Sequence, residues 1–121
     1  MSLARAAGLI DLAFAVFHIL FWRLFFWTNT LAASGRINAA ITQTLNLVLI
    51  YVFVAYGAAL IWVVSDAGKS TSILLAAGAG FWGLRLAVQF ALFPLGHWAS
   101  VVVTIGFAVA LVVHAWAAMT I

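Results

Sequence analysis

Four long apolar segments constrain the fold of this chain more than any other feature. Crossing the ~30 Å hydrocarbon core of a bilayer as a helix takes about 20 apolar residues. Segments of at least this length run over residues 8–27, 39–64, 71–93 and 98–120. A segment surrounded by lipid must be helical, because its backbone polar groups find no water to bind there. The pattern therefore predicts an all-α integral membrane protein.

The composition agrees with a membrane location. Of the 121 residues, 69% are hydrophobic and only 6% are charged, and the mean hydropathy is +1.29. An average soluble domain is about 25% charged, so this chain lacks the polar surface that water requires. Its length suits one domain, and we expect a single transmembrane domain over residues 1–121 whose main partner is the lipid bilayer.

Short polar stretches separate the apolar segments and predict the topology. They are "TNTLAASGRIN" (28–38), "SDAGKSTS" (65–72), which reads as a tight turn, and "FPLGHWAS" (93–100). Connections this short make consecutive helices antiparallel neighbours. We therefore expect an up-down four-helix bundle with both termini on one side of the membrane.

Basic residues near the segment ends give little asymmetry for setting the orientation. Arg5 and Lys69 lie on the side of the termini, Arg36 lies on the other side, and Arg23 and Arg85 lie near it. The excess of basic residues in cytoplasmic loops then favours cytoplasmic termini only if Arg23 and Arg85 are buried. On that reading both termini face the cytoplasm.

Several function classes lack the residues they need. The net charge of +3 comes from few groups without a Lys/Arg cluster, which argues against a nucleic-acid partner. The absence of cysteine excludes disulfides, thiolate metal sites and cysteine nucleophiles. The histidines show no HxxxH or HExxH spacing, and the serines have no nearby His–acid pair. We therefore expect neither a metal site nor an enzyme.

One group of polar residues falls in the half of the bilayer away from the termini. It contains Arg23, Thr42, Gln43, Asn46, Arg85 and Gln89. An arginine inside a bilayer is costly and needs partners, yet no carboxylate falls in this half. Guanidinium groups bind phosphate or carboxylate in a bidentate manner, so the group predicts a site for an anionic lipid or organic acid. Arg85 would pair with the anion, Arg23 would assist, and the amides of Gln43, Asn46 and Gln89 would orient it.

The alternative for this group is structural. Arg23 and Arg85 can extend toward the headgroups, and Asn and Gln can form interhelical hydrogen bonds.

A second polar group contains Asp11, His18 and His114. Asp11 and His18 are two helical turns apart and share a face, while His114 lies on the last segment, a neighbour of the first in a closed bundle. Two histidines on facing helices can ligate the iron of haem b, and the three residues together can form a proton relay. The alternative is that each histidine bonds a hydroxyl or carbonyl in a packed interior.

Three stretches resemble small bacterial four-helix membrane proteins of unassigned function. They are "FHILFWRLFFW", "NAAITQTLN" and "FWGLRLAVQFALF", and the size and helix number are similar to those of DoxX-like proteins. The resemblance implies the four-helix fold and a bacterial inner membrane, and no particular activity.

Three functions remain in view from the sequence. The leading expectation is a binding protein or small transporter for an anionic amphiphile. The alternatives are a haem-binding electron-transfer subunit and a structural subunit of a larger membrane complex. We also expect a homo-oligomer or a larger assembly, with small residues around Gly78 and Gly80 forming the contact between copies.

Overall fold

The structure, a computed structural model, describes residues 1–63 and 68–121, and this part of the chain is helical without strands, which confirms the all-α prediction. Its elements are α1 (Leu3–Ile19), α2 (Phe21–Leu24), α3 (Trp27–Thr30), the 3₁₀ turn η1 (Ala32–Ser34), α4 (Arg36–Ala58), the π-helical turn η2 (Ala59–Val63), α5 (Lys69–Leu92) and α6 (Trp98–Thr120). Residues 65–67 of the tight turn predicted over 65–72 lie outside the described residues, and α5 begins within the predicted turn at Lys69.

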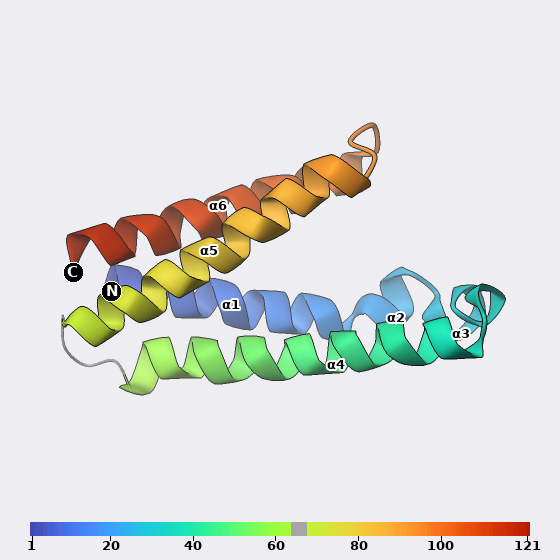
Figure 1. Cartoon of the computed structure of the whole chain (residues 1–121), viewed down its shortest axis with the longest axis horizontal. Coiled ribbons are helices and arrows are strands. Elements are labelled where there is room, and N and C mark those ends of the chain that lie inside the picture. Colours follow the sequence, from blue (N-terminus) through green and yellow to red (C-terminus); the bar gives the residue numbers. More distant parts are fainter. Residues whose placement is uncertain (64–67) are drawn as a thin grey trace.

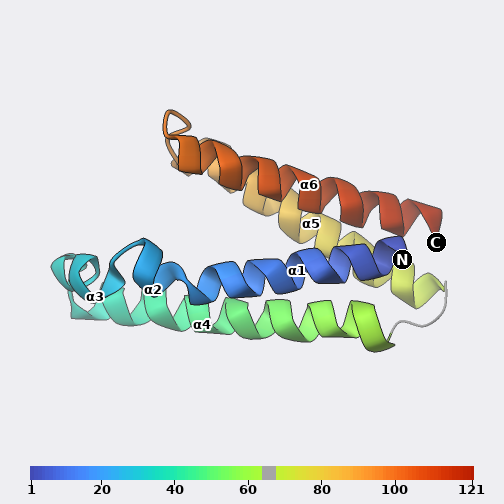
Figure 2. The same ribbon diagram turned by 180° about the vertical axis from the view of Figure 1, so that it is seen from behind.

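The long helices alternate in direction and form two antiparallel pairs. Figure 1 shows α1 beside α4 and α5 beside α6, with both chain termini at the end where the pairs come together. The pairs diverge toward α3 and the loop before α6, as the reverse view in Figure 2 also shows. Helix α1 packs against both α4 and α6, whereas the backbones of α4 and α5 are not closely packed. Consecutive helices are therefore closely packed within each pair, whereas α4 and α5 meet only through side chains such as Phe53, Tyr56 and Trp82.

Three helices are long and apolar enough to cross a membrane: Arg36–Trp62, Lys69–Leu92 and Trp98–Thr120. Their outward surfaces carry large apolar side chains that a water-soluble protein would bury. Exposed examples are Ile37, Val48, Leu84, Phe90, Val102, Ile105 and Val112.

The first apolar segment is not the single helix predicted over 8–27. Helix α1 begins five residues earlier, where the Ser2 hydroxyl accepts from the Arg5 N–H, and it ends at Ile19 after 17 residues. The chain then forms α2, and the helix is broken at Phe26, whose backbone is left-handed with φ of 51°. The Thr30 hydroxyl donates to the carbonyl oxygens of Phe25 and Phe26 at 2.8 and 3.0 Å, and the Phe26 oxygen also accepts from the backbone N–H groups of Asn29 and Thr30 at 2.9 Å.

Two glycines let helices α1 and α4 pack closely. A Cβ on Gly8 would lie 2.7 Å from the carbonyl oxygen of Gly57, and one on Gly57 would lie 2.8 Å from that of Gly8. The backbones of α1 and α4 therefore touch where they cross, a contact typical of membrane helices. Nearby, the core contains Ala4, Ala7, Leu60, Leu75 and Ala117, and toward the middle it contains Ala15, Phe53, Trp82, Phe107 and Ala110.

Candidate functional site

A carboxylate and an imidazole from opposite ends of the sequence meet in the interior. Asp11 of α1 is 1% exposed and His114 of α6 is fully buried. The Asp11 Oδ2 lies 3.0 Å from the His114 Nε2, and the Trp82 Nε1–H donates to the Asp11 Oδ1 at 3.1 Å. The second imidazole nitrogen, Nδ1, lies 2.7 Å from the carbonyl oxygen of Ala110. Every polar atom of the Asp11–His114 pair thus has a partner.

The hydrogen bonds of His114 fix where one proton must be. A carbonyl oxygen only accepts, so the Nδ1 of His114 carries a hydrogen and donates it to Ala110. The 3.0 Å contact between Nε2 and the Asp11 Oδ2 then needs a second proton between the two atoms. That proton sits on the imidazole in an ion pair, or on the carboxyl group in a neutral pair. In both forms the pair has no net charge, which keeps the free energy of burying it low.

Two further residues shape the surroundings of the pair. The ring of Tyr56 stacks on that of His114 with a centroid distance of 5.9 Å, and its hydroxyl donates to the carbonyl oxygen of Leu74 at 2.9 Å. Gly78 makes room for both rings, because a Cβ there would collide with the Tyr56 hydroxyl and lie 2.6 Å from the His114 Cδ2. The predicted contact between copies through Gly78 is therefore wrong, since Tyr56 and His114 of the same chain cover this residue. Gly80 faces open space.

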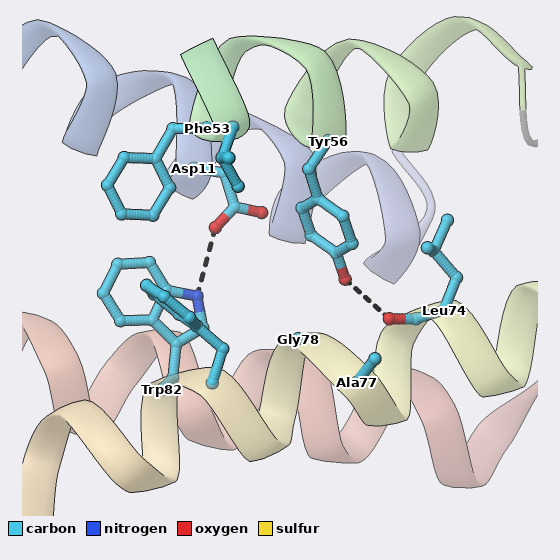
Figure 3. Close-up of a pocket in the computed structure, with 9 residues that line it drawn as sticks. Asp11, Phe53, Tyr56, Leu74, Ala77, Gly78 and Trp82 are labelled. Carbon is cyan, nitrogen blue, oxygen red and sulfur yellow. Dashed lines mark hydrogen bonds between the residues drawn. The ribbon is translucent and has the colours of Figure 1, made fainter. Parts of the chain in front are cut away.

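A cavity of about 210 Å³ lies beside the pair, where α4 and α5 stand apart. Figure 3 shows the Asp11 carboxylate and the Tyr56 and Trp82 rings around it, with Gly78 at its base. Its walls are almost entirely apolar and aromatic, and Asp11 supplies the ionisable group. The lining residues are Asp11, Val52, Phe53, Tyr56, Leu74, Ala77, Gly78, Phe81 and Trp82.

His18 lies apart from the Asp11–His114 pair. Its Nδ1 lies 2.7 Å from the Asn46 Oδ1, and the Asn46 Nδ2 donates to the His18 carbonyl oxygen at 2.9 Å. The amide oxygen only accepts, so the imidazole donates. This two-point contact joins α1 to α4. Both nitrogens of His114 are already bonded, so ligation of haem iron by His114 would require breaking one of those bonds.

Arg85 lies against α6 and not against α4. Its guanidinium carbon is 4.3 Å from the centroid of the Phe107 ring and 5.2 Å from that of Phe93. Its Nη1 donates to the Oε1 of buried Gln89 at 3.3 Å. The face of an aromatic ring attracts a cation, so these contacts stabilise a partly buried arginine without a carboxylate.

The other residues of the predicted anion site are elsewhere. The Gln43 Oε1 accepts from the Trp22 Nε1–H at 3.0 Å, and its Nε2 donates to the carbonyl oxygen of Ala39 at 3.2 Å. Arg23 is exposed. Within the described ranges no hydrogen bond joins Arg85 to the amides of α4, so the five predicted residues are divided among separate places and only Arg85 and Gln89 are bonded to each other.

Trp82 has a sequence signal that points to Asp11 as its partner. An indole N–H in the middle of an apolar helix needs an acceptor, and Asp11 is the only acid within the predicted spans. Tyr56 had no comparable signal, because its partner is a backbone carbonyl.

Comparison with protein families, with curated proteins and with solved structures finds no match to this chain. The likeness in layout to DoxX-like proteins therefore stays an expectation, and the function must be argued from the geometry.

Proposed function

We propose that the chain is a membrane protein located in the bacterial inner membrane, with four spans and both termini in the cytoplasm. Three helices are long enough to cross, and α1 packs between α4 and α6 as a fourth member of the bundle. Helices α1 and α2 together cover residues 3–24, and at 1.5 Å per residue this is roughly 33 Å, enough for the first crossing.

We further propose that it binds or transports a small molecule and couples this to the proton shared by Asp11 and His114. The observation that carries the proposal is that Asp11, one half of this buried pair, lines a cavity. Ionisable residues within membrane helices are costly, and they typically mark ligand and proton pathways. A ligand entering the cavity would alter the electrostatic field at the carboxylate and hence the affinity of the pair for its proton.

Reconstitution into liposomes tests this coupling. A pH-sensitive dye inside the vesicles reports proton movement after addition of benzyltrimethylammonium, benzyl alcohol or benzenesulfonate, three aromatic probes that differ in charge. We expect at least one probe to change the internal pH with the natural protein and with Gly80→Ala, whose new methyl group faces open space. The change should be absent with Asp11→Asn. If no probe moves protons beyond the level of protein-free liposomes, or if Asp11→Asn behaves like the natural protein, the proposal is wrong.

A second candidate function, binding of an anionic lipid or organic acid, rests on Arg85. This arginine is partly buried, and among the described residues its hydrogen-bond partner is an amide and not a carboxylate. Its charge is therefore free to pair with an external anion.

Native mass spectrometry of the protein in mild detergent tests this candidate and reports the number of copies in a homo-oligomer. Arg85→Gln should lose a retained anion, while Arg23→Gln, a matched change at an exposed arginine, should keep it. Equal retention by both variants would argue against an anion site at Arg85.

A further inference from the structure

The cavity beside Asp11 offers hydrogen-bond acceptors but no free donor from its side chains. The Trp82 N–H already donates to Asp11, and the Tyr56 O–H already donates to Leu74. By contrast, the Asp11 Oδ1 accepts one hydrogen bond, from Trp82, in both forms of the pair, and an oxygen of this kind accepts about two. The polar part of the lining is therefore electron-rich, which disfavours an anion and favours a cation.

The aromatic walls of the cavity also favour a cation over an anion. Phe53 and Phe81 meet edge to face at 5.6 Å between centroids, and both contact the ring of Trp82, at 5.5 and 5.1 Å. Tyr56 stacks on His114 and lies on the other side of Asp11 from Phe53 in Figure 3. Faces of Trp, Tyr and Phe attract cations, most strongly where water is excluded. Ring faces and a carboxylate thus border one cavity.

We propose that the ligand of this cavity is a small aromatic or aliphatic ammonium cation, which replaces the proton of the Asp11–His114 pair. The proposal rests on the proposed function and adds the charge class of the ligand and the direction of the exchange. An engineered cavity of about 150 Å³ holds benzene, so a cavity of about 210 Å³ accommodates a ring with a small ammonium group.

The exchange balances in charge and in protons. Before binding, Asp11 and His114 hold one proton between Oδ2 and Nε2 and have no net charge. When the cation pairs with the Asp11 carboxylate, this proton leaves the imidazole or carboxyl group for solvent, and His114 remains neutral with its Nδ1–H on Ala110. Each bound cation releases one proton, wherever in the pair that proton began. The other groups facing the pair are the Tyr56 hydroxyl from α4 and the Trp82 N–H from α5, and both keep their hydrogens.

Calorimetry on the purified full chain in detergent tests the proposal with benzyltrimethylammonium, whose charge does not depend on pH. Titrations in two buffers with different ionisation enthalpies give the number of protons released. Neopentylbenzene, the neutral compound of the same shape, is the matched ligand control. We expect the cation to bind about tenfold or more tightly than the neutral compound, a difference of about 1.4 kcal/mol, with release of close to one proton.

Two variants separate the roles of charge and cavity. Asp11→Asn should weaken cation binding by about tenfold or more and abolish proton release. Ala77→Leu should fill the cavity and weaken both compounds while the pair stays intact, and Gly80→Ala should bind like the natural chain.

The outcomes distinguish this inference from the proposed function. If the neutral compound binds as well as the cation, or if the cation binds without releasing a proton, the cation proposal is overturned while a ligand cavity remains. If the liposome assay responds only to benzenesulfonate or benzyl alcohol, proton coupling stands and the charge class is wrong. If neither compound binds and no probe moves protons, both proposals fail together.

Discussion

Replacing Asp11 tests the hydrogen-bond arrangement on which the proposals depend. In Asp11→Asn, the amide oxygen can still accept from the Trp82 N–H, and the amide nitrogen can donate to the Nε2 of a neutral His114. No buried group loses its partner. We therefore expect the free energy of unfolding to change by no more than about 1 kcal/mol, the typical net contribution of one hydrogen bond.

Asp11→Leu removes both acceptors and should be far more damaging. The Trp82 N–H and the His114 Nε2 would then be buried without partners. Leaving a buried polar group unsatisfied costs about 1–3 kcal/mol, so the two groups together cost about 2–6 kcal/mol. Leucine and asparagine thus differ sharply at this position, although leucine is the more natural residue for an apolar helix.

Unfolding by SDS in mixed micelles, followed by circular dichroism, measures both changes under one condition. The prediction requires Asp11→Leu to be less stable than Asp11→Asn by at least about 2 kcal/mol. If the two variants lose equal stability, then the charge of Asp11 and not its hydrogen bonding holds the site together. If both match the natural protein, Asp11 is not buried against Trp82 and His114, and the reasoning about the cavity is wrong.

Three further predictions concern other parts of the bundle. Gly78→Ala should lower the free energy of unfolding by about 1–3 kcal/mol through overpacking. Gly80→Ala should leave it unchanged or raise it by up to about 1 kcal/mol, because alanine favours the helix. Equal free energies of unfolding for the two variants in SDS would contradict this prediction. Asn46→Leu leaves an imidazole N–H and a backbone carbonyl of α1 without their partner; because His18 is only partly buried and water can replace part of what is lost, the two groups together should cost about 1–3 kcal/mol in the same assay, less than in Asp11→Leu. The chain has no cysteine, so single cysteines at Ser2 and Ser34 can be labelled with a membrane-impermeant maleimide; they should react from opposite sides, and reaction from one side would show that α1 does not cross.

The later helices were predictable from sequence because their apolar runs end at clear loop residues. Helix α6 covers the predicted range 98–120, and α5 covers residues 69–92 against the predicted 71–93. The first segment could not be divided in the same way, since residues 20–27 contain no proline or glycine and are apolar apart from Arg23. Hydropathy cannot detect a break of this kind. The break coincides with the left-handed backbone of Phe26 and with the Thr30 hydroxyl that donates to the carbonyl oxygens of Phe25 and Phe26.

The candidate site was only partly predictable. The position of a residue along a helix indicates its depth in the membrane, but it does not indicate which neighbouring helix the side chain contacts. Depth along the helices groups Asp11 with His114, and the adjacent first and last helices bring the two residues into contact. His18 was grouped with them, yet it faces α4 and bonds Asn46. Arg85 was grouped with the amides of α4 for the same reason, although it lies against α6. Packing between helix pairs decides which residues meet, and a single sequence does not contain that information.

The structure gives the charged residues of the first apolar segment opposite environments, and this bears on which of them can respond to a ligand. Arg23 is exposed, so its charge can be neutralised by headgroups or water. Asp11 is buried and is neutralised by a single proton shared with His114. A charge that solvent already compensates gains little from a ligand, whereas a buried carboxylate must exchange one compensating cation for another. Coupling between ligand and proton therefore belongs at Asp11, and the cavity beside it is where the competing cation would enter.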